Sequence, residues 1–309
     1  MKKIILTLVV SCLCLIVASF LISLNKNSKD LLAEPDNYYS KLPLSKNVFL
    51  TASLTSDYLP IRNWAIETPE FNAKTVAVFD PNGKKFLYQK NINKQLPIAS
   101  LTKIMTAIIA IENLDLQDTI TVSKKAVMTE GSSGDLIVGE KLTIENLLYV
   151  MLIESSNDAA TAIADNLENF IDLMNQKAEE LSLSSTFFTD ATGISKLNYS
   201  TANDLICLIE NSLNKSLIWK ILKTKEATVY SQNKKISHQL QNTNKLLGEV
   251  EAVINGKTGF TQEAGECMLT IIKVPNKPEG YLIVVILGSD NRELETKKII
   301  NWILKAYVW

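Results

Sequence analysis

The chain has 309 residues, enough for one large domain or two ordinary ones. Its 32 Lys and Arg nearly balance its 33 Asp and Glu, and the net charge of -1 disfavours a nucleic-acid-binding protein. The single histidine, His238, excludes a histidine-rich metal site and leaves only one candidate base for a Ser-His-Asp triad. We therefore expect a hydrolytic site without a histidine base, and we expect no metal, no cofactor and no nucleic-acid partner.

The first predicted element is an apolar segment at the N-terminus. Lys2 and Lys3 precede an uncharged run from Ile4 to Leu24 that is long enough to cross a bilayer as a helix. The two lysines favour a cytoplasmic N-terminus, which places the rest of the chain on the extracytoplasmic side. We interpret residues 1–24 as an anchor in the cell membrane. The alternative is a cleaved signal segment, which would leave a secreted or periplasmic protein.

Residues 25–72 have neither a helical nor a strand period. Four prolines interrupt this stretch, and we interpret it as a tether between the membrane and a folded domain at 73–309. Beyond the apolar segment only Cys207 and Cys267 remain, and we expect them to be unpaired residues that fill space in the fold.

The predicted domain begins with strands and then becomes helical. Residues 75–79 and 85–88 have the composition of strands, and Asp80-Pro81-Asn82-Gly83 between them is typical of a turn. Residues 101–111 are apolar on nearly every side, which predicts a buried helix. Further helices are expected at 142–163, 166–181 and 201–213, strands at 227–230, 266–274 and 281–287, and an amphipathic helix at 292–307. This order indicates a sheet interrupted by a helical insertion at about 113–213.

Ser100 and Lys103 form the first candidate catalytic pair, at the start of the predicted buried helix. Residues three apart share a helix face, so the lysine amine can reach the serine hydroxyl. Burial would lower the lysine pKa, and the helix N-terminus would favour negative charge near the serine. The same spacing begins at Ser23, Ser212 and Ser231, where a solvated helix face is the simpler explanation. The buried context distinguishes Ser100.

Two later motifs can complete a site around such a pair. Ser155-Ser156-Asn157 follows an apolar stretch, on an expected turn between two helical segments, where a hydroxyl and a carboxamide can point into one cleft; helix capping is the alternative. Lys257-Thr258-Gly259 occurs once and follows Asn255-Gly256, which is typical of a turn, so a plain hairpin is its alternative.

The three motifs in this order resemble those of the D-alanyl-D-alanine carboxypeptidase family of low-molecular-mass penicillin-binding proteins. Further similar segments lie at 97–107, 152–160, 192–205, 242–247 and 256–265. The resemblance covers about residues 73–309. It implies an α/β (α+β) fold of the penicillin-binding and β-lactamase-like transpeptidase type, in which an antiparallel sheet is flanked by helices and carries an inserted helical subdomain.

The same resemblance implies a serine peptidase of cell-wall biogenesis. Such an enzyme removes the terminal D-alanine from peptidoglycan stem peptides that end in D-Ala-D-Ala, and it is inhibited by β-lactams, which bind covalently. Ser100 would attack the carbonyl between the two D-alanines, and Lys103 would take the hydroxyl proton. Ser155 would relay a proton to the leaving D-alanine, while Asn157 would orient the substrate amide and the lysine.

Substrate contacts are implied for the third motif. Lys257 and Thr258 would hold the terminal carboxylate, and Gly259 would let the substrate backbone approach the strand edge. Backbone N–H groups of Ser100 and Phe260 would form the oxyanion hole. Arg292 would add positive charge near the carboxylate, with a surface role as its alternative.

Three features depart from the family pattern. Ser156 stands where the family usually has glycine, and Phe260 stands where many members have histidine. The sequence ends at Trp309, before the β-rich second domain and C-terminal anchor of most members, so we expect the N-terminal segment to anchor the protein. His238 has no role in this scheme, and we expect it on the surface.

Three alternative functions remain at this point. A class A β-lactamase would need a deacylating glutamate, but residues 190–205 contain only Asp190 and Asp204 as acids. Ser289-Asp290-Asn291 matches a lactamase triplet but follows the Lys257 motif, in the wrong order. A D,D-endopeptidase would use the same residues on a cross-linked substrate. A non-catalytic β-lactam- or cell-wall-binding module is the third alternative, and the full set of catalytic residue types disfavours it.

Overall fold

The computed structural model describes residues 60–277 and 280–309. The predicted anchor at 1–24 and most of the predicted tether lie outside the described residues. Within the described part, every helix is too short or too polar to cross a bilayer.

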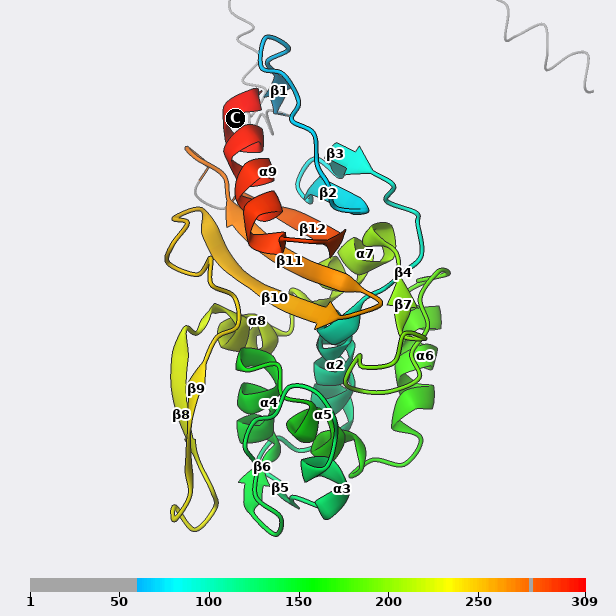
Figure 1. The fold of residues 1–309 in the computed structure, drawn as a ribbon, viewed down its shortest axis with the longest axis vertical. Coiled ribbons are helices and arrows are strands. Elements are labelled where there is room, and N and C mark those ends of the chain that lie inside the picture. The colour runs from blue at the N-terminus through cyan, green and yellow to red at the C-terminus, as the bar shows by residue number, and fades with distance from the viewer. Residues whose placement is uncertain (1–59, 278–279) are drawn as a thin grey trace, which may run out of the picture. The chain divides into compact units, whose positions relative to one another are not determined.

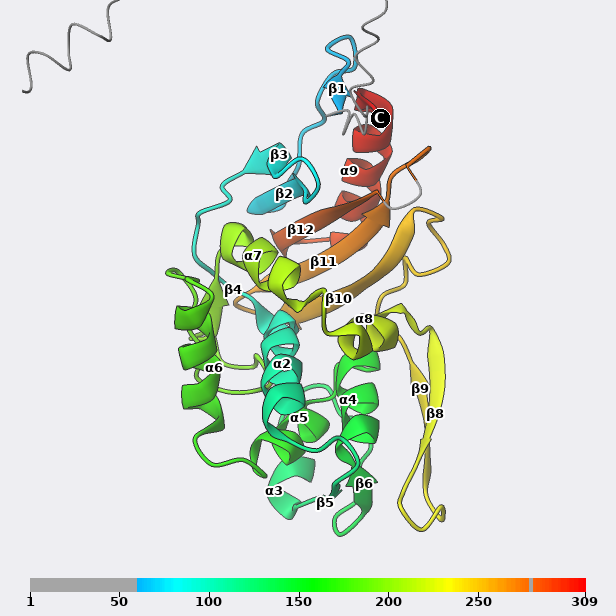
Figure 2. The ribbon, with the colours of Figure 1, turned by 180° about the vertical axis from the view of Figure 1, so that it is seen from behind.

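A five-stranded antiparallel sheet, in the order β10-β11-β12-β2-β3, organises the domain (Figure 1). Its strands are β2 (Thr75–Asp80), β3 (Lys85–Lys90), β10 (Val253–Thr261), β11 (Gly265–Lys273) and β12 (Tyr281–Ser289). Both faces of the sheet are covered. Helix α9 (Arg292–Ala306) packs on one face, and Figure 2 shows α7 (Ala202–Ser212) on the opposite face.

Strand β12 is apolar without interruption from residue 282 to residue 287 because it supplies two cores. In β12, Ile283, Val285 and Leu287 belong to the core shared with the helical region. The alternating residues Leu282 and Val284 belong to the second core, beneath α9. Side chains of a strand alternate between its faces, so a sheet covered on both sides needs apolar residues at every position.

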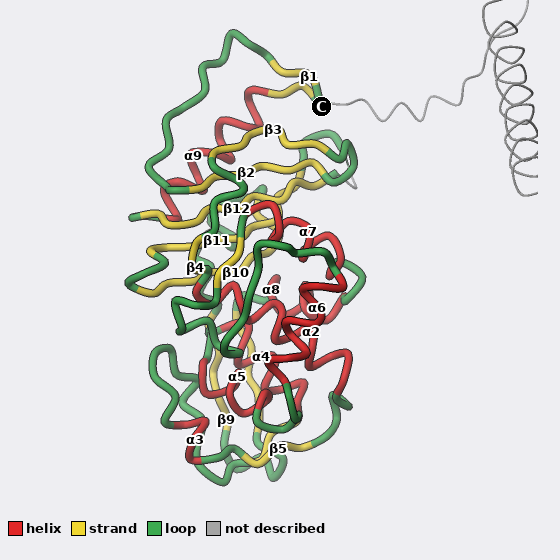
Figure 3. The backbone as a smooth tube through the Cα atoms, turned by 90° about the vertical axis from the view of Figure 1, so that its right-hand side faces the viewer, coloured by secondary structure: helices red, strands yellow, loops and turns green. Residues whose placement is uncertain are grey.

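The helical region lies on the side of the sheet opposite α9 (Figure 3). It begins with a 3-10 turn, η2 (Ala99–Thr102), which leads directly into the buried helix that the sequence predicts. The buried helix is α2 (Lys103–Asn113). The region also contains α7, α3 (Lys124–Val127), α4 (Ile144–Ile153), α5 (Asn157–Ala164), α6 (Phe170–Glu180) and α8 (Ser216–Lys223). The region is therefore wider than the predicted insertion at 113–213.

Short strand pairs connect the parts of the domain. They are β1 (Ile61–Arg62) with β13 (Tyr307–Val308), β4 (Leu96–Pro97) with β7 (Tyr199–Ser200), β5 (Thr119–Thr121) with β6 (Lys141–Thr143), and β8 (Glu226–Tyr230) with β9 (Ser237–Gln241). The pairing of β1 with β13, together with the buried side chain of Phe71, places residues before 73 in the folded body. The predicted tether boundary at residue 72 is thus too far along the chain.

One predicted turn is wrong. Asn255 and Gly256 lie inside β10, where they pair with Ile271 and Thr270 of β11. A register shift between Val253 and Asn255 accommodates the irregular sequence. The Asn-Gly pair has a strong local preference for a turn, but pairing with β11 in a sheet covered on both faces overrides that preference.

Candidate active site

The first candidate pair lies where η2 meets α2, as the sequence predicts. Nζ of Lys103 is 2.9 Å from Oγ of Ser100. Ser100 is half-buried, whereas the Lys103 side chain is fully buried in the helical core. The preceding residue, Ala99, has a positive φ of 47°, so the chain turns sharply into the helix at the nucleophile.

Lys103 has two further hydrogen-bond partners, and both are obligate acceptors. Its amine donates to Oδ1 of Asn157 at 2.6 Å and to the carbonyl oxygen of Thr192 at 2.7 Å. In the neutral amine these two acceptors take both N–H hydrogens. The nitrogen lone pair is then left for the Ser100 hydroxyl, which is the arrangement a general base requires.

The charge state of Lys103 suits this role. Burial lowers the pKa of Lys103 to about 7, even though the nearby carboxylates of Asp190 and Asp158 act in the opposite direction. A substantial fraction of the free amine is therefore present near neutral pH.

This pKa predicts the pH dependence of the reaction. Only the free amine can take the Ser100 proton, and its fraction falls about tenfold per pH unit below the Lys103 pKa. The rate of acylation by a β-lactam should therefore decrease as the pH is lowered through about 7. Stopped-flow measurement of this rate between pH 5 and 9 checks the expectation. A flat profile across pH 7 would contradict it.

The second motif joins α4 to α5. Ser155 has a positive φ of 64°, and Ser156 caps α5 by accepting a hydrogen bond from the Ala159 N–H. Serine is a favoured N-cap residue, so the residue that departs from the family pattern has a local structural role. Asn157 is fixed on its other side, because its Nδ2 donates to the Glu130 carbonyl at 2.7 Å and thereby turns Oδ1 toward Lys103.

The third motif brings a second buried lysine to Ser155. Nζ of Lys257 donates to Oγ of Ser155 at 2.7 Å and to the Thr258 carbonyl at 3.0 Å. Thr258 is almost fully buried, and its hydroxyl shares a hydrogen bond with Thr243. Gly259 lies against the nucleophile turn, since a Cβ there would be 3.0 Å from the Ser100 nitrogen. A Cβ at this position would therefore crowd the backbone of the nucleophile turn.

Two basic side chains, Lys257 and Arg292, lie at the β10 end of the site. Burial lowers the pKa of Lys257 well below its usual range, and the nearby Lys103 and Arg292 cations lower it further. Among the described residues, no carboxylate pairs with Lys257. Arg292, at the start of α9, donates from Nη1 to the Gly259 carbonyl at 3.0 Å. Arg292 thus lies at the third motif, and its role toward a substrate carboxylate stays a prediction.

A loop that the sequence did not assign to catalysis completes the site. The Asp190 carboxylate accepts hydrogen bonds from the backbone N–H groups of Thr192, Gly193 and Ser195, and so holds the Thr192 carbonyl toward Lys103. Gly193 has a φ of 86°, and a Cβ there would lie 2.0 Å from the Ala99 carbonyl oxygen. The signal in the sequence was the family-like segment 192–205, but that segment did not indicate that a backbone carbonyl would bind Lys103.

Replacing Gly193 with alanine should therefore both destabilise the protein and slow acylation. The clash is with backbone, so either the loop or the nucleophile turn must shift, at a cost of about 2–3 kcal/mol in unfolding free energy. Gly139→Ala is the matched control, because φ there is 82° but a Cβ would meet nothing within 4 Å. Thermal unfolding and acylation rates of both variants check this. Equal effects of the two substitutions would contradict it.

The positions of four other residues bear on the sequence predictions. His238, expected on the surface, is instead 7% exposed and hydrogen-bonded to Glu140; the alternation of β9 points it inward. Cys207 and Cys267 are both free thiols, as expected. The Phe260 side chain is 64% exposed beside the motif, so the bulky ring is open to solvent.

Comparison with known proteins agrees with this geometry. The family model for D-alanyl-D-alanine carboxypeptidase matches residues 63–291. The chain belongs to this family. One relative is the D-alanyl-D-alanine carboxypeptidase DacF of Bacillus subtilis. It is 32% identical to this chain, over 76% of this chain and 63% of its own length. The D-alanyl-D-alanine endopeptidase of Pseudomonas aeruginosa is 30% identical, over 76% of this chain and 78% of its own.

A solved structure has the same fold as this chain. The crystal structure of a Streptomyces DD-transpeptidase superimposes with a TM-score of 0.70 at 29% identity, covering 77% of this chain and 98% of that one. The penicillin-binding peptidase fold predicted from the sequence is thereby confirmed. The chain spans less than two thirds of the length of the Bacillus relative.

Proposed function

We propose that the protein is a serine-type D-Ala-D-Ala carboxypeptidase that removes the terminal D-alanine from peptidoglycan stem peptides and is acylated by penicillin. One observation carries this proposal. The Lys103 amine is buried, has a lowered pKa, gives its two hydrogens to Asn157 and Thr192, and lies 2.9 Å from the Ser100 hydroxyl. A serine activated in this way can attack an acyl carbon without a histidine.

Acylation would proceed at Ser100. Its Oγ bonds to the carbonyl carbon between the two D-alanines while the hydroxyl proton passes to Nζ of Lys103, and the carbonyl oxygen becomes an oxyanion. Backbone N–H groups of Ser100 and Phe260 are assigned to that oxyanion, by analogy with other acyl-transfer sites. The C–N bond then breaks, and the leaving D-alanine amine takes a proton through the Ser155 hydroxyl. Water hydrolyses the Ser100 ester and restores the enzyme.

The β10 end of the site suits a substrate that carries a carboxylate. Lys257 is fully buried beside the Arg292 guanidinium and has no described carboxylate partner. Protonation of a buried amine of this kind is costly unless an anion pairs with it, and the lowered pKa of Lys257 reflects that cost. The terminal carboxylate of a stem peptide, or the equivalent group of penicillin, would supply that charge, with Thr258 as a further contact.

An endopeptidase is the second candidate, because several relatives at about 30% identity carry that name. The discriminating experiment incubates the full chain with a D-Ala-D-Ala pentapeptide and, in parallel, with a D-Ala cross-linked dimer. Preferential release of free D-alanine supports the carboxypeptidase, and preferential cleavage of the dimer supports the endopeptidase. Cleavage of neither substrate would refute both.

A class A β-lactamase is disfavoured on a specific observation. Asp190 is the acid closest in sequence to the expected deacylating position. Its carboxylate accepts hydrogen bonds from backbone N–H groups of its own loop. Its carboxylate is thus committed to holding Thr192, which leaves no acid of this loop to activate a deacylating water. Deacylation of the β-lactamase type, through an acid of this loop, is therefore not expected.

We also propose that residues 1–24 anchor the protein in the cell membrane, with the catalytic domain on the extracytoplasmic side. The support is the uncharged run after Lys2 and Lys3. Fractionation of cells that express the full chain, followed by alkaline extraction, tests the anchor. Recovery of the protein in the membrane pellet supports it, and a shortened protein in the soluble fraction indicates cleavage.

A further inference from the structure

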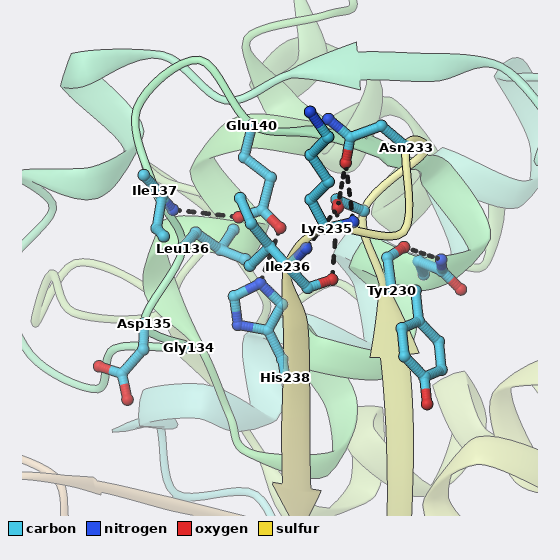
Figure 4. Close-up of polar contacts among 12 residues, drawn as sticks. Gly134, Asp135, Leu136, Ile137, Glu140, Tyr230, Asn233, Lys235, Ile236 and His238 are labelled. Carbon is cyan, nitrogen blue, oxygen red and sulfur yellow. Dashed lines mark hydrogen bonds and ion pairs between the residues drawn. The ribbon is translucent and has the colours of Figure 1, made fainter.

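A buried carboxylate–imidazole pair lies outside the site described above. Oε1 of Glu140 is 2.8 Å from Nε2 of His238, and the two side chains are 0% and 7% exposed. His238 belongs to β9 in the hairpin that runs beside α4, and Glu140 ends the loop that precedes β6. Figure 4 shows the carboxylate between the His238 ring and the backbone N–H of Ile137. The proposed reaction uses neither residue.

The loop that ends at Glu140 is bonded directly to the second catalytic motif. The Asn157 backbone N–H donates to the Ser132 carbonyl at 2.7 Å, and Asn157 Nδ2 donates to the Glu130 carbonyl. Two residues further on, the Gly134 N–H donates to the Asp158 carboxylate at 2.9 Å. Residues 130–134 therefore determine which way the Asn157 carboxamide faces.

Glu140 fixes the other end of this loop. Its Oε2 accepts a hydrogen bond from the Ile137 N–H at 3.1 Å, only three residues after Gly134. Of the loop residues 130–139, only Gly134 and Leu136 are buried, so few packing contacts hold the loop and its hydrogen bonds must do so. His238 contacts Oε1 of the carboxylate from the opposite side, and removal of His238 would leave that buried oxygen without this partner.

From these contacts we infer that Glu140 and His238 are positioning residues for the acylation step. The pair holds the 130–137 loop against Asn157, and Asn157 in turn presents Oδ1 to the Lys103 amine. The effect on catalysis passes through the orientation of Asn157 and needs no contact with substrate. A base misplaced by about 1 Å can cost about 100-fold in rate, so a loosened loop would be visible in the kinetics. The inference rests on the proposed function.

The experiment compares β-lactam acylation rates of full-length variants. Glu140→Ala should slow acylation about 10-fold to 100-fold, and Glu140→Gln should restore most of the rate, because an amide can still accept from Ile137 and reach His238.

Glu295→Ala is the matched control. Glu295 is also a buried carboxylate that accepts hydrogen bonds from loop N–H groups, at Asn72 and Ala73, but it lies on the α9 side of the sheet. This control should lower the melting temperature and leave the acylation rate within about twofold.

A double-mutant cycle separates positioning from a general loss of structure. In an Asn157→Ala background, Glu140→Ala should cost less than about twofold further, because the side chain it orients is gone. A full additional loss in that background would overturn the inference. So would a wild-type rate for Glu140→Ala, or an equal slowing by Glu295→Ala. Failure of the proposed function itself would appear differently, as an unaltered protein that forms no acyl-enzyme.

Discussion

Replacing Ser100 with alanine is expected to abolish turnover. The substitution removes the only atom that can form the acyl bond, while the small side chain leaves the η2 turn and the neighbouring helix intact. Loss of the nucleophile in serine hydrolases costs orders of magnitude, and we expect D-alanine release to fall by at least about 10⁴-fold. Release from a D-Ala-D-Ala peptide, followed with a D-amino-acid oxidase assay, measures this.

The chain offers a matched control for this substitution. Ser212 and Lys215 have the same spacing, but Ser212 donates to the Ile209 carbonyl and Lys215 pairs with Glu112 at 2.6 Å. Ser212→Ala should therefore keep the unaltered release rate. Residual activity of Ser100→Ala at more than a few per cent would show that another residue is the nucleophile.

Replacing Lys103 with methionine should produce the second largest effect. Methionine has a similar length and suits the apolar surroundings, but it cannot take the Ser100 proton. General-base catalysis contributes about 10²–10⁴-fold, and the penicillin acylation rate should fall within that range. The substitution also leaves the Asn157 and Thr192 oxygens without their donor, so a lower melting temperature is expected as well.

The rate loss must be separated from the loss of stability. Acylation is therefore measured well below the melting temperature of the variant, beside Lys215→Met, which removes the lysine of the matched pair. The control should acylate at the unaltered rate. If Lys103→Met acylates within about tenfold of the unaltered protein, the proton acceptor is another group and the assignment of Lys103 is wrong.

The candidate site could be predicted from the sequence wherever side chains carry the chemistry. Ser100 and Lys103 were predictable because helical spacing places residues three apart on one face, and the apolar run indicated burial. The strands of the sheet were predictable for a similar reason, since composition and length separate β2 and β12 from the helices.

Contacts made by backbone atoms could not be predicted in this way. The Thr192 carbonyl that binds Lys103 comes from 89 residues away, and any residue type has a carbonyl. Asn157 is likewise oriented by the Glu130 carbonyl. The buried position of His238 was missed because it depends on β9 folding against the loop that ends at Glu140, a pairing without a local signature.

The most direct test of the central claim is the site at which penicillin attaches. The full chain is incubated with benzylpenicillin, quenched, digested and analysed by mass spectrometry. We expect one penicilloyl adduct per chain, on the peptide that contains Ser100, and no adduct in Ser100→Ala. An unmodified protein, or an adduct that maps to another serine, would contradict it.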